Sequence, residues 1–393
     1  MSDPIVIAGA ARTPMGGFQG VLAGATAASL GGVAIAGALK RADLSPAAVD
    51  ELLMGCVLPA GQGQAPARQA GFAAGLTENV PATTLNKMCG SGMKAVMIAH
   101  DQLLLGNGKV VVAGGMESMT NAPYLLPKMR GGARLGHGAV IDHMFLDGLE
   151  DAYDKGRLMG SFAEDCAKKF QFTREAQDEY ALGSLERALA AQKDGFEGEI
   201  APVTVHGRKE DTVIETDEQP QTARPEKIPQ LKPAFREGGT VTAANSSSIS
   251  DGAAALVLMR ESEAKALKLK VLARIMGHAS HAQAPGWFTT APIPAAQKLL
   301  RKIGWQTDDV DLWEVNEAFA VVPMAFMHEL GLPREVVNIH GGACALGHPI
   351  GASGARILVT LLNALEKRDL KRGLAAICIG GGEATAVAIE RVA

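Results

Sequence analysis

The sequence predicts an α/β protein built from two copies of one open-sheet unit. In residues 1–120 predicted strands alternate with predicted helices, and this alternation resumes after residue 250. Residues 121–230 between them differ in composition. Strands separated by helices of this size predict a parallel, doubly wound sheet. A chain of 393 residues is also too long for one compact core, so two or three domains or a duplicated fold are expected.

Apolar periodicity and turn residues define the elements of the first part. The expected strands are 5–8, 49–57, 83–86 and 110–114, and the expected helices are 29–40, 66–74 and 93–105. Residues 121–230 are richer in proline, glycine and charge, with helical patches at 163–169 and 174–192. This composition predicts a loop-rich insertion rather than an independent core.

Landmarks of the first part recur in the last part at nearly constant spacing. The matched pairs are Ser91-Gly92 with Ser353-Gly354 (offset 262), Val49-Asp50 with Val310-Asp311 (offset 261), and Gly114-Gly115 with Gly380-Gly381 (offset 266). Chance similarity of glycine-rich turns is the alternative explanation. A duplicated sheet would bring equivalent loops together at a pseudo-twofold junction, where open α/β sheets bind their ligands.

Composition restricts the class of protein. Lys plus Arg number 38 against 42 for Asp plus Glu, a net charge of −4, which argues against a nucleic-acid binder. No apolar run is long enough to cross a membrane, and the segment Met1–Pro4 before the first strand has no targeting pattern. Five widely spaced cysteines, an odd number, are typical of reduced thiols. We expect a cytoplasmic protein without nucleic-acid or membrane partners.

Cys89 stands on the predicted turn between strand 83–86 and helix 93–105. Unpaired N–H groups at a helix start stabilise an anion, so this thiol should ionise more readily than a free one. A small buried core cysteine is the alternative. The sequence Gly90-Ser91-Gly92, and partners from the second copy, favour a reactive thiol.

Three segments of the second copy follow predicted strands. They are Asn338–Arg356 with His348, Cys378–Glu383, and Trp313–Ala320 with Asn316. By the repeat, all three should lie at the same end of the sheets as Cys89. A neutral imidazole can take the thiol proton, and a second thiol can exchange a proton with a carbon or a leaving thiolate. The N–H groups of Gly380–Gly382 could hold an oxyanion.

Two other interpretations of these motifs are less favoured. His340-x3-Cys344 and Cys344-x3-His348 have spacings compatible with zinc ligation, but no CxxC pair accompanies them, so we expect no metal. Two glycine-containing segments lack a full GxGxxG, which favours turns over nucleotide-binding loops: Gly61-Gln62-Gly63 and Gly106-Asn107-Gly108.

These motifs together resemble those of the thiolases along essentially the whole chain, above all the biosynthetic branch of acetyl-CoA C-acetyltransferases. Gly92-Met93-Lys94 favours that branch, because degradative thiolases more often carry Ser-Met-Gln there. The matching stretches, in the family's order, are Arg12-Thr13-Pro14, 61–64, 86–95, 239–243, Asn245-Ser246-Ser247, 316–320, 340–354 and 378–382.

The resemblance implies a reversible Claisen condensation of two acetyl-CoA to acetoacetyl-CoA plus CoA, by a ping-pong mechanism. Cys89, activated by His348, would attack an acyl-CoA thioester and become acylated. Cys378 would deprotonate the second acetyl-CoA, or protonate the leaving group in thiolysis. Asn316, through a water, would stabilise the enolate oxygen with His348. The N–H groups of Cys89 and Gly380 would form the other oxyanion hole.

The resemblance also implies a thiolase fold, a duplicated five-layered αβαβα core with a loop-rich insertion domain. Residues 1–118 with 248–270 would form the first core, residues 119–247 the loop domain, and residues 271–393 the second core. The insertion would carry the coenzyme A cover and a tetramerisation loop, so a homotetramer, a dimer of dimers, is expected. Coenzyme A thioesters would be substrates, with no cofactor.

The resemblance implies that seven side chains contact coenzyme A. Ser247 would contact the pantetheine, and Arg224, with Lys227, would meet the phosphates unless both are simply solvated. Four apolar side chains would line the pantetheine and acyl tunnel: Leu158, Met159, Phe235 and Phe319. Ordinary core packing is the alternative for Leu158 and Met159.

Three positions depart from the family pattern. Leu158 replaces a histidine of some acetoacetyl-CoA thiolases, Cys344 replaces an aliphatic residue and is expected to have no catalytic role, and Glu383 stands where a neutral residue is common. A degradative 3-ketoacyl-CoA thiolase of broader chain length is the main alternative. A non-catalytic acyl-CoA-binding relative is another, but it would be expected to lose Cys89, His348 or Cys378.

Overall fold

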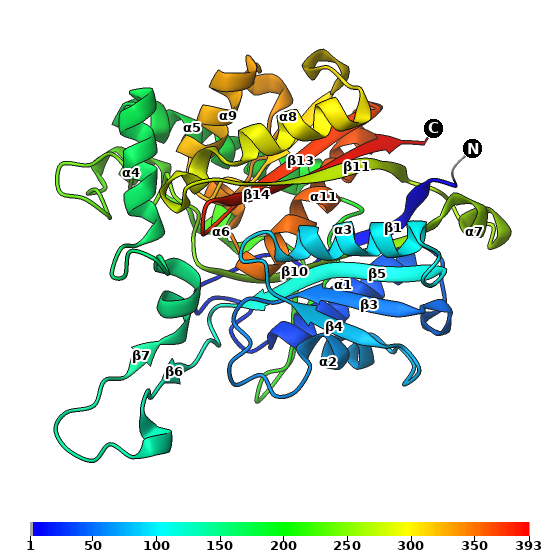
Figure 1. Cartoon of the computed structure of the whole chain (residues 1–393), viewed down its shortest axis with the longest axis horizontal. Coiled ribbons are helices and arrows are strands. Elements are labelled where there is room, and N and C mark those ends of the chain that lie inside the picture. The colour runs from blue at the N-terminus through cyan, green and yellow to red at the C-terminus, as the bar shows by residue number, and fades with distance from the viewer. Residues whose placement is uncertain (1–2, 393) are drawn as a thin grey trace.

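A computed structural model describes residues 3–392 of the chain, so Met1 and Ser2 of the predicted leaderless N-terminus lie outside the described residues. Figure 1 shows five stacked layers, in which two sheets alternate with three layers of helices. The outer helices are α1 (Ala27–Arg41) and α2 (Pro66–Ala73) on one side, and α8 (Pro292–Ile303) and α9 (Val321–Leu330) on the other. Between the sheets lie α3 (Ser91–Leu104) and α11 (Ile350–Lys367). The predicted fold class is confirmed.

The two sheets join edge to edge. The strands of the first half are β1 (Ile5–Arg12), β3 (Glu51–Gly55), β4 (Ala82–Leu85), β5 (Val110–Ser118) and β10 (Ser250–Arg260). Those of the second half are β11 (Ala273–Ala282), β12 (Leu312–Val315), β13 (Arg372–Ile379) and β14 (Glu383–Arg391). Their order is β4-β3-β5-β10-β1-β11-β14-β13-β12, with the short β2 (Gly16–Gly17) beside β10. Only Val6 and Ile7 pair with β11, so the junction between the halves is short.

The strand order confirms the duplication, because each half repeats the same arrangement. Asp50 and Asp311 show it in detail. The Asp50 carboxylate accepts the N–H groups of Lys109 (2.7 Å) and Val110 (2.9 Å). The Asp311 carboxylate accepts those of Lys371 (2.9 Å) and Arg372 (2.7 Å) in the same way.

The central helices meet at a pseudo-twofold axis. A Cβ atom on Gly92 of α3 would lie 2.9 Å from the backbone N of Ala355, and one on Gly354 of α11 would lie 2.5 Å from that of Met93. The two contacts are reciprocal at the common offset of 262. Glycine is needed at both positions because a side chain would strike the facing backbone.

The expectation of a parallel sheet is wrong for most strand pairs. β3 runs parallel to β4 and β5, and β12 to β13, but the pairs β5–β10 and β13–β14 are antiparallel, as are the pairs of β1. Only Gly380–Gly382 join β13 to β14, and a connection this short can join only antiparallel strands. Residues 119–249 fill the same place between β5 and β10, so the insertion is an expanded hairpin connection.

One repeat landmark is also wrong. Gly114 and Gly115 lie inside β5, which continues to Ser118, whereas Gly380 follows the end of β13. The common offset of 262 pairs Gly380 with Ser118 instead. Similar glycine pairs at two strand ends produced the false match.

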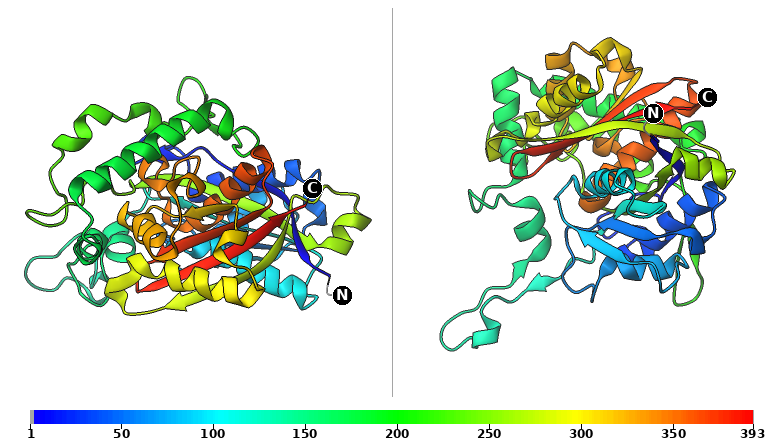
Figure 2. Two further views of the ribbon diagram at one scale, coloured as in Figure 1. Left: turned by 90° about the horizontal axis from the view of Figure 1, so that it is seen from above. Right: turned by 45° about the vertical axis from the view of Figure 1, so that its right-hand side comes forward.

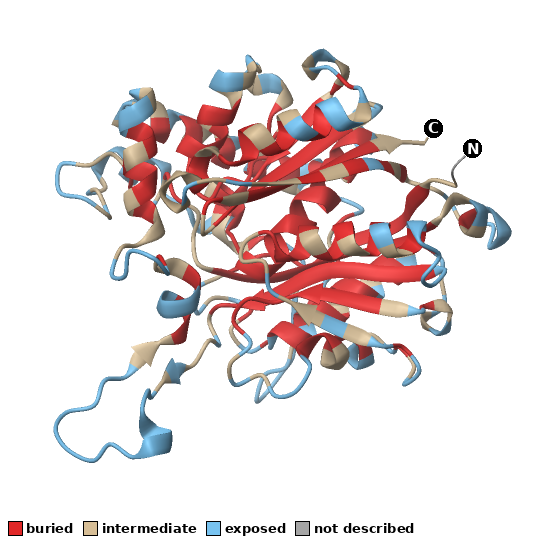
Figure 3. Cartoon of the chain, viewed as in Figure 1, coloured by how far each residue is buried: buried red, intermediate tan, exposed pale blue. Residues whose placement is uncertain are grey.

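The insertion is more ordered than a loop-rich segment suggests. It contains α4 (Met159–Phe170), α5 (Arg174–Ala190), α6 (Glu218–Thr222), and the strand pairs β6 (Tyr124–Leu125) with β7 (Ile141–Asp142) and β8 (Val203–Val205) with β9 (Thr212–Ile214). Outside it, two further short helices are α7 (Glu261–Ala266) and α10 (Ala343–Leu346). Figure 2 shows the β6–β7 hairpin extending away from the layers, and Figure 3 shows its tip fully exposed. Within residues 3–392, no helix is long and apolar enough to cross a membrane.

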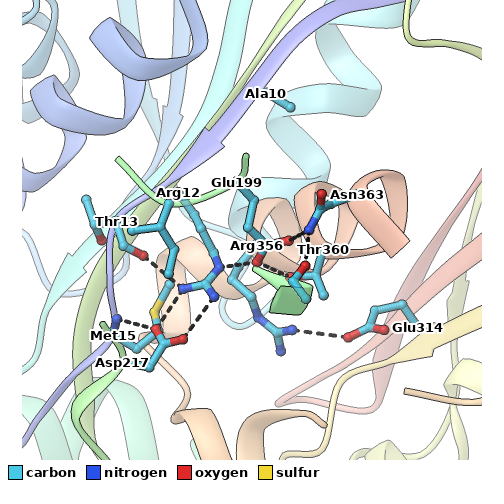
Figure 4. Close-up of polar contacts among 12 residues, drawn as sticks. Ala10, Arg12, Thr13, Met15, Glu199, Asp217, Glu314, Arg356, Thr360 and Asn363 are labelled. Carbon is cyan, nitrogen blue, oxygen red and sulfur yellow. Dashed lines mark hydrogen bonds and ion pairs between the residues drawn. The ribbon is translucent and has the colours of Figure 1, made fainter. Parts of the chain in front are cut away.

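A buried polar network anchors the insertion to the core (Figure 4). Arg12, at the end of β1, pairs with Glu199 (Nε to Oε1, 2.5 Å) and with Asp217 (Nη1 to Oδ1, 2.7 Å), both from the insertion. Glu199 also accepts hydrogen bonds from Thr360 and Asn363 of α11. Because each charge is paired inside the protein, this network fixes the insertion against both β1 and α11.

Candidate active site

Cys89 lies on the turn between β4 and α3, as predicted, and is partly exposed. This turn packs against the β13–β14 hairpin. A Cβ atom on Gly90 would lie 2.4 Å from Cδ1 of Ile379 in β13. The absence of a side chain at Gly90 therefore lets the Cys89 turn and the Gly380–Gly382 turn approach closely.

The environment of the Cys89 sulfur contradicts the expectation of an easily ionised thiol. Burial raises the pKa of Cys89 to about 11, although the backbone N–H groups of Gly380 and of Cys89 itself favour the thiolate. Two N–H groups do not replace the water that the anion would lose. The protein therefore holds Cys89 as a thiol, and this thiol needs a base to become a nucleophile.

The raised pKa of Cys89 predicts a specific pH profile for alkylation. We expect the rate of Cys89 modification by iodoacetamide to rise about tenfold per pH unit between about pH 6 and 9, because only the thiolate reacts and its fraction stays small. Mass spectrometry of the Cys89 peptide measures this rate. A rate that is flat across this range would mean a preformed thiolate–imidazolium pair and would contradict the assignment.

His348 lies just before α11 and is buried. Burial and the nearby charge of Arg356 lower the pKa of His348 to about 3, so the imidazole is neutral. Its Nδ1 lies 2.6 Å from the Ser353 hydroxyl, which itself donates to the Pro349 carbonyl at 2.9 Å. Ser353 must then accept the proton on Nδ1, which leaves the lone pair on Nε2. No described residue hydrogen-bonds to Nε2, so this atom is free to act as a base.

The start of α11 is held beside the Cys89 turn. Ile350 packs in one apolar cluster with Met88 and Cys89. The buried Glu117 carboxylate accepts the N–H groups of Gly351 (2.9 Å) and Val57 (2.9 Å) and so joins α11 to the end of β3. Burial raises the pKa of Glu117 to about 7.

Cys378, near the end of β13, is fully buried and lies near enough to Cys89 for the charge of that sulfur to act on it. Its pKa lies well above the ordinary value, first because of burial and second because of the charge that Cys89 would carry. Both thiols are therefore protonated at rest. Once Cys378 loses its proton, its thiolate is a strong base.

Asn316 follows the end of β12, and its backbone N–H donates to Ala376 of β13 at 3.0 Å. Neither its side-chain oxygen nor its side-chain nitrogen has a partner within residues 3–392, although both are buried. Buried amide groups are normally hydrogen-bonded, so this site is suited to a water or a substrate oxygen.

The expected coenzyme A contacts fall into two groups. Arg224 and Lys227 line a cavity of about 360 Å³, a volume typical of a ligand pocket. Ser248 also lines this cavity, and the neighbouring Ser247 hydroxyl donates to the Ala318 carbonyl at 2.9 Å. Arg224 and Lys227 are both exposed, which leaves their charges free for a ligand.

The second group is apolar and includes a side chain next to Gly380. Phe235 and Phe319 meet edge to face with ring centroids 5.9 Å apart. The Met159 sulfur lies 3.6 Å from where a Gly380 Cβ would stand. Leu158 is the residue before the first turn of α4 and is partly exposed. The structure therefore places the Met159 side chain next to Gly380.

The residues with zinc-like spacing point toward different partners. His340 meets the Phe196 ring edge to face, Cys344 lies near the Glu317 carbonyl, and His348 bonds to Ser353. A separate cluster forms where Asp101 Oδ1 lies 3.2 Å from His100 Nδ1 and 2.9 Å from His278 Nε2. Burial, and after it the charges of Lys302 and Lys94, lower the pKa of His278, and these two positive charges would repel a divalent cation there.

Sequence reasoning did not identify Ser353 and Glu117 as part of this site. Ser353 served only as a repeat landmark, although it sits five residues after His348. The signal for Glu117 was an acidic residue inside an otherwise apolar strand, because a buried carboxylate is costly unless it is paired or hydrogen-bonded. Which backbone groups it holds depends on the strand order, and no local pattern shows that order.

Comparison with known proteins identifies the family of the chain. Residues 5–262 match the thiolase N-terminal domain and residues 269–391 the thiolase C-terminal domain. The chain is 53% identical to acetyl-CoA acetyltransferase 2 of Arabidopsis thaliana, over 98% of this chain and 96% of the relative. It is 50% identical to acetyl-CoA acetyltransferase of Cupriavidus necator over the whole of both. The crystal structure of the Bacillus anthracis acetyl-CoA acetyltransferase superposes with a TM-score of 0.96, at 42% identity, covering 100% of this chain and 99% of that one. The chain therefore belongs to the thiolase family.

Proposed function

We propose that this chain is an acetyl-CoA C-acetyltransferase that condenses two acetyl-CoA to acetoacetyl-CoA and CoA, reversibly and through an acetyl-Cys89 intermediate. The observation that carries the proposal is that the Cys89 and Cys378 sulfurs lie near enough to interact, with the Gly380 N–H hydrogen-bonded to the Cys89 sulfur. Relatives about half identical to the chain bear the name of this activity.

In the first half-reaction, the Cys89 sulfur attacks the thioester carbonyl carbon while His348 Nε2 takes the thiol proton. The carbonyl oxygen becomes an oxyanion between the N–H groups of Cys89 and Gly380. The bond from carbon to the coenzyme A sulfur then breaks, and the departing thiolate takes the proton of Cys378. This leaves acetyl-Cys89, a protonated His348 and a Cys378 thiolate.

In the second half-reaction, the Cys378 thiolate removes a methyl proton from a second acetyl-CoA. The protonated His348, and Asn316 through a water, stabilise the enolate oxygen. The enolate carbon attacks the acetyl carbonyl of Cys89, and the tetrahedral intermediate collapses to acetoacetyl-CoA. The Cys89 sulfur leaves and recovers its proton from His348, so every proton returns to its starting position.

A profile of thiolysis against substrate length tests this function. We expect kcat/KM for acetoacetyl-CoA to exceed that for 3-ketooctanoyl-CoA by about tenfold or more, because a tunnel shaped for acetyl groups rejects longer chains. Equal or greater activity on the longer substrate would favour a degradative 3-ketoacyl-CoA thiolase. Folded protein that forms no acetyl adduct on Cys89 with acetyl-CoA would favour a non-catalytic acyl-CoA-binding protein.

We assign the coenzyme A phosphates to the cavity beside Arg224 and Lys227, and the pantetheine to the path past Ser247 toward Met159, Phe235 and Phe319. The charges at the mouth and the apolar lining near Gly380 support this direction of entry. Leu158 would lie at the edge of the path.

We also propose a homotetramer, a dimer of dimers, joined through the β6–β7 hairpin. This hairpin carries apolar side chains into solvent, including Leu135, which is 98% exposed. Exposed apolar groups gathered on one projecting segment are typical of an interaction surface.

Five free cysteines within the described residues are compatible with a cytoplasmic location. The domain limits 1–118 with 248–270, 119–247 and 271–393 remain our proposed division.

A further inference from the structure

The turn that carries Cys89 is strained and held from several sides. Met88 has a φ of +48°, in the left-handed region that residues other than glycine seldom adopt. The Asn86 side chain accepts the Met88 N–H at 2.9 Å, and the Ser91 hydroxyl accepts the Lys87 N–H at 2.8 Å. A strained backbone of this kind persists only where surrounding contacts determine it, and such places are often functional.

The second turn of the site is equally constrained. Gly381 and Gly382 have φ values of +92° and +86°. The Gly382 carbonyl accepts the Gln283 N–H at 2.8 Å, and a Cβ on Gly382 would lie 2.4 Å from the Gln283 carbonyl oxygen. The proposed oxyanion hole takes one N–H from each turn, so its geometry depends on how the turns sit against each other.

An ion pair joins these two turns directly. Lys87 Nζ lies 2.5 Å from Glu383 Oε2, with the side chains 26% and 35% exposed. Glu383 pairs with Ile379 across the hairpin, so both side chains lie on the face that contacts Gly90. Lys87 stands two residues before the nucleophile, and Glu383 stands three residues after Gly380.

We propose that Lys87 and Glu383 are a positioning pair that holds the Gly380 N–H at hydrogen-bond distance from the oxygen of the substrate carbonyl that Cys89 attacks. This inference rests on the function proposed above. A donor in an oxyanion hole acts only at hydrogen-bond distance from the developing charge, so a small displacement of one turn weakens it. The pair also explains why an acidic residue occupies position 383.

The alternative is that Lys87 acts alone, as a positive charge near the developing oxyanion. The two roles predict opposite results for Glu383→Gln. If Lys87 acts by its charge, removing the neutralising carboxylate maintains or raises the rate. If the pair positions the turns, Glu383→Gln and Lys87→Met are equally harmful.

The experiment measures acetylation of Cys89 by acetyl-CoA under single-turnover conditions, with KM and melting temperature as parallel readouts. We expect Glu383→Gln and Lys87→Met each to slow acetylation about tenfold with little change in KM, a fraction of the 10²–10³-fold loss that removing a donor causes. The double variant should be no slower than either single variant, because the two residues act as one unit. Lys87→Arg should retain most of the rate.

A matched control is Glu366→Gln, which breaks the exposed pair of Lys270 and Glu366 (3.0 Å; 73% and 49% exposed) outside the two turns and should leave acetylation unchanged. Wild-type acetylation by Glu383→Gln, or additive losses in the double variant, would overturn the positioning role. A wild-type enzyme that forms no acetyl-Cys89 would overturn the proposed function instead.

Discussion

Replacing Cys89 by alanine is expected to lower acetoacetyl-CoA formation by about four orders of magnitude or more, because the proposed mechanism passes through a thioester on the Cys89 sulfur. Coenzyme A affinity should stay within about twofold, since the proposed coenzyme cavity is lined by other residues. Turnover assays and titration calorimetry with coenzyme A measure the two effects separately.

Cys166→Ala is the matched control, because it also removes a buried thiol with a raised pKa, on α4, that takes no part in the proposed chemistry. It should keep most of its turnover. Substantial turnover by Cys89→Ala, or an acetyl adduct on another cysteine in that variant, would refute the assignment of the nucleophile.

Replacing Cys378 by alanine is expected to separate the two half-reactions. Acetylation of Cys89 should persist, because a coenzyme A thiolate can leave without help from an acid. Condensation should fall by about 10³-fold or more, because nothing remains to remove the methyl proton. Mass spectrometry detects the trapped acetyl-Cys89, and exchange of methyl protons of acetyl-CoA with deuterated water reports the loss of the base.

The same Cys166→Ala protein serves again as the control, since Cys166 lies near enough to raise the pKa of Cys378 and yet has no assigned proton. If Cys378→Ala condenses at a normal rate, or still exchanges the methyl protons, another residue is the base.

Much of the fold could be predicted from local pattern. Helices such as α3 and α5 begin close to their expected positions, because apolar spacing and turn residues are local signals. The direction of the strands could not be predicted from local pattern. The alternation of strands and helices suggested a parallel sheet, but β10 and β14 return antiparallel, and which strands become neighbours depends on the whole topology.

The residues of the site were predictable by type, but their ionisation was not. Cys89, Cys378 and Asn316 lie at or just after strand ends, where the sequence placed them, but the strand expected before the His348 segment is replaced by short helical turns. The helix-start argument predicted a more acidic Cys89 thiol, and burial reversed the sign. Burial is a property of the assembled layers, and the same is true of the Lys87–Glu383 pair, whose members lie far apart in the chain.

The reciprocal contact of Gly92 and Gly354 has a consequence for how chemistry is divided within the chain. At the offset of 262, Asn86 is the counterpart of His348, Gly351 of Cys89, and Cys378 of Met116. Each half therefore lacks what the other supplies, and the symmetric scaffold hosts a single asymmetric centre. Either half produced alone would be inert, and only reassembly of the two fragments would restore catalysis.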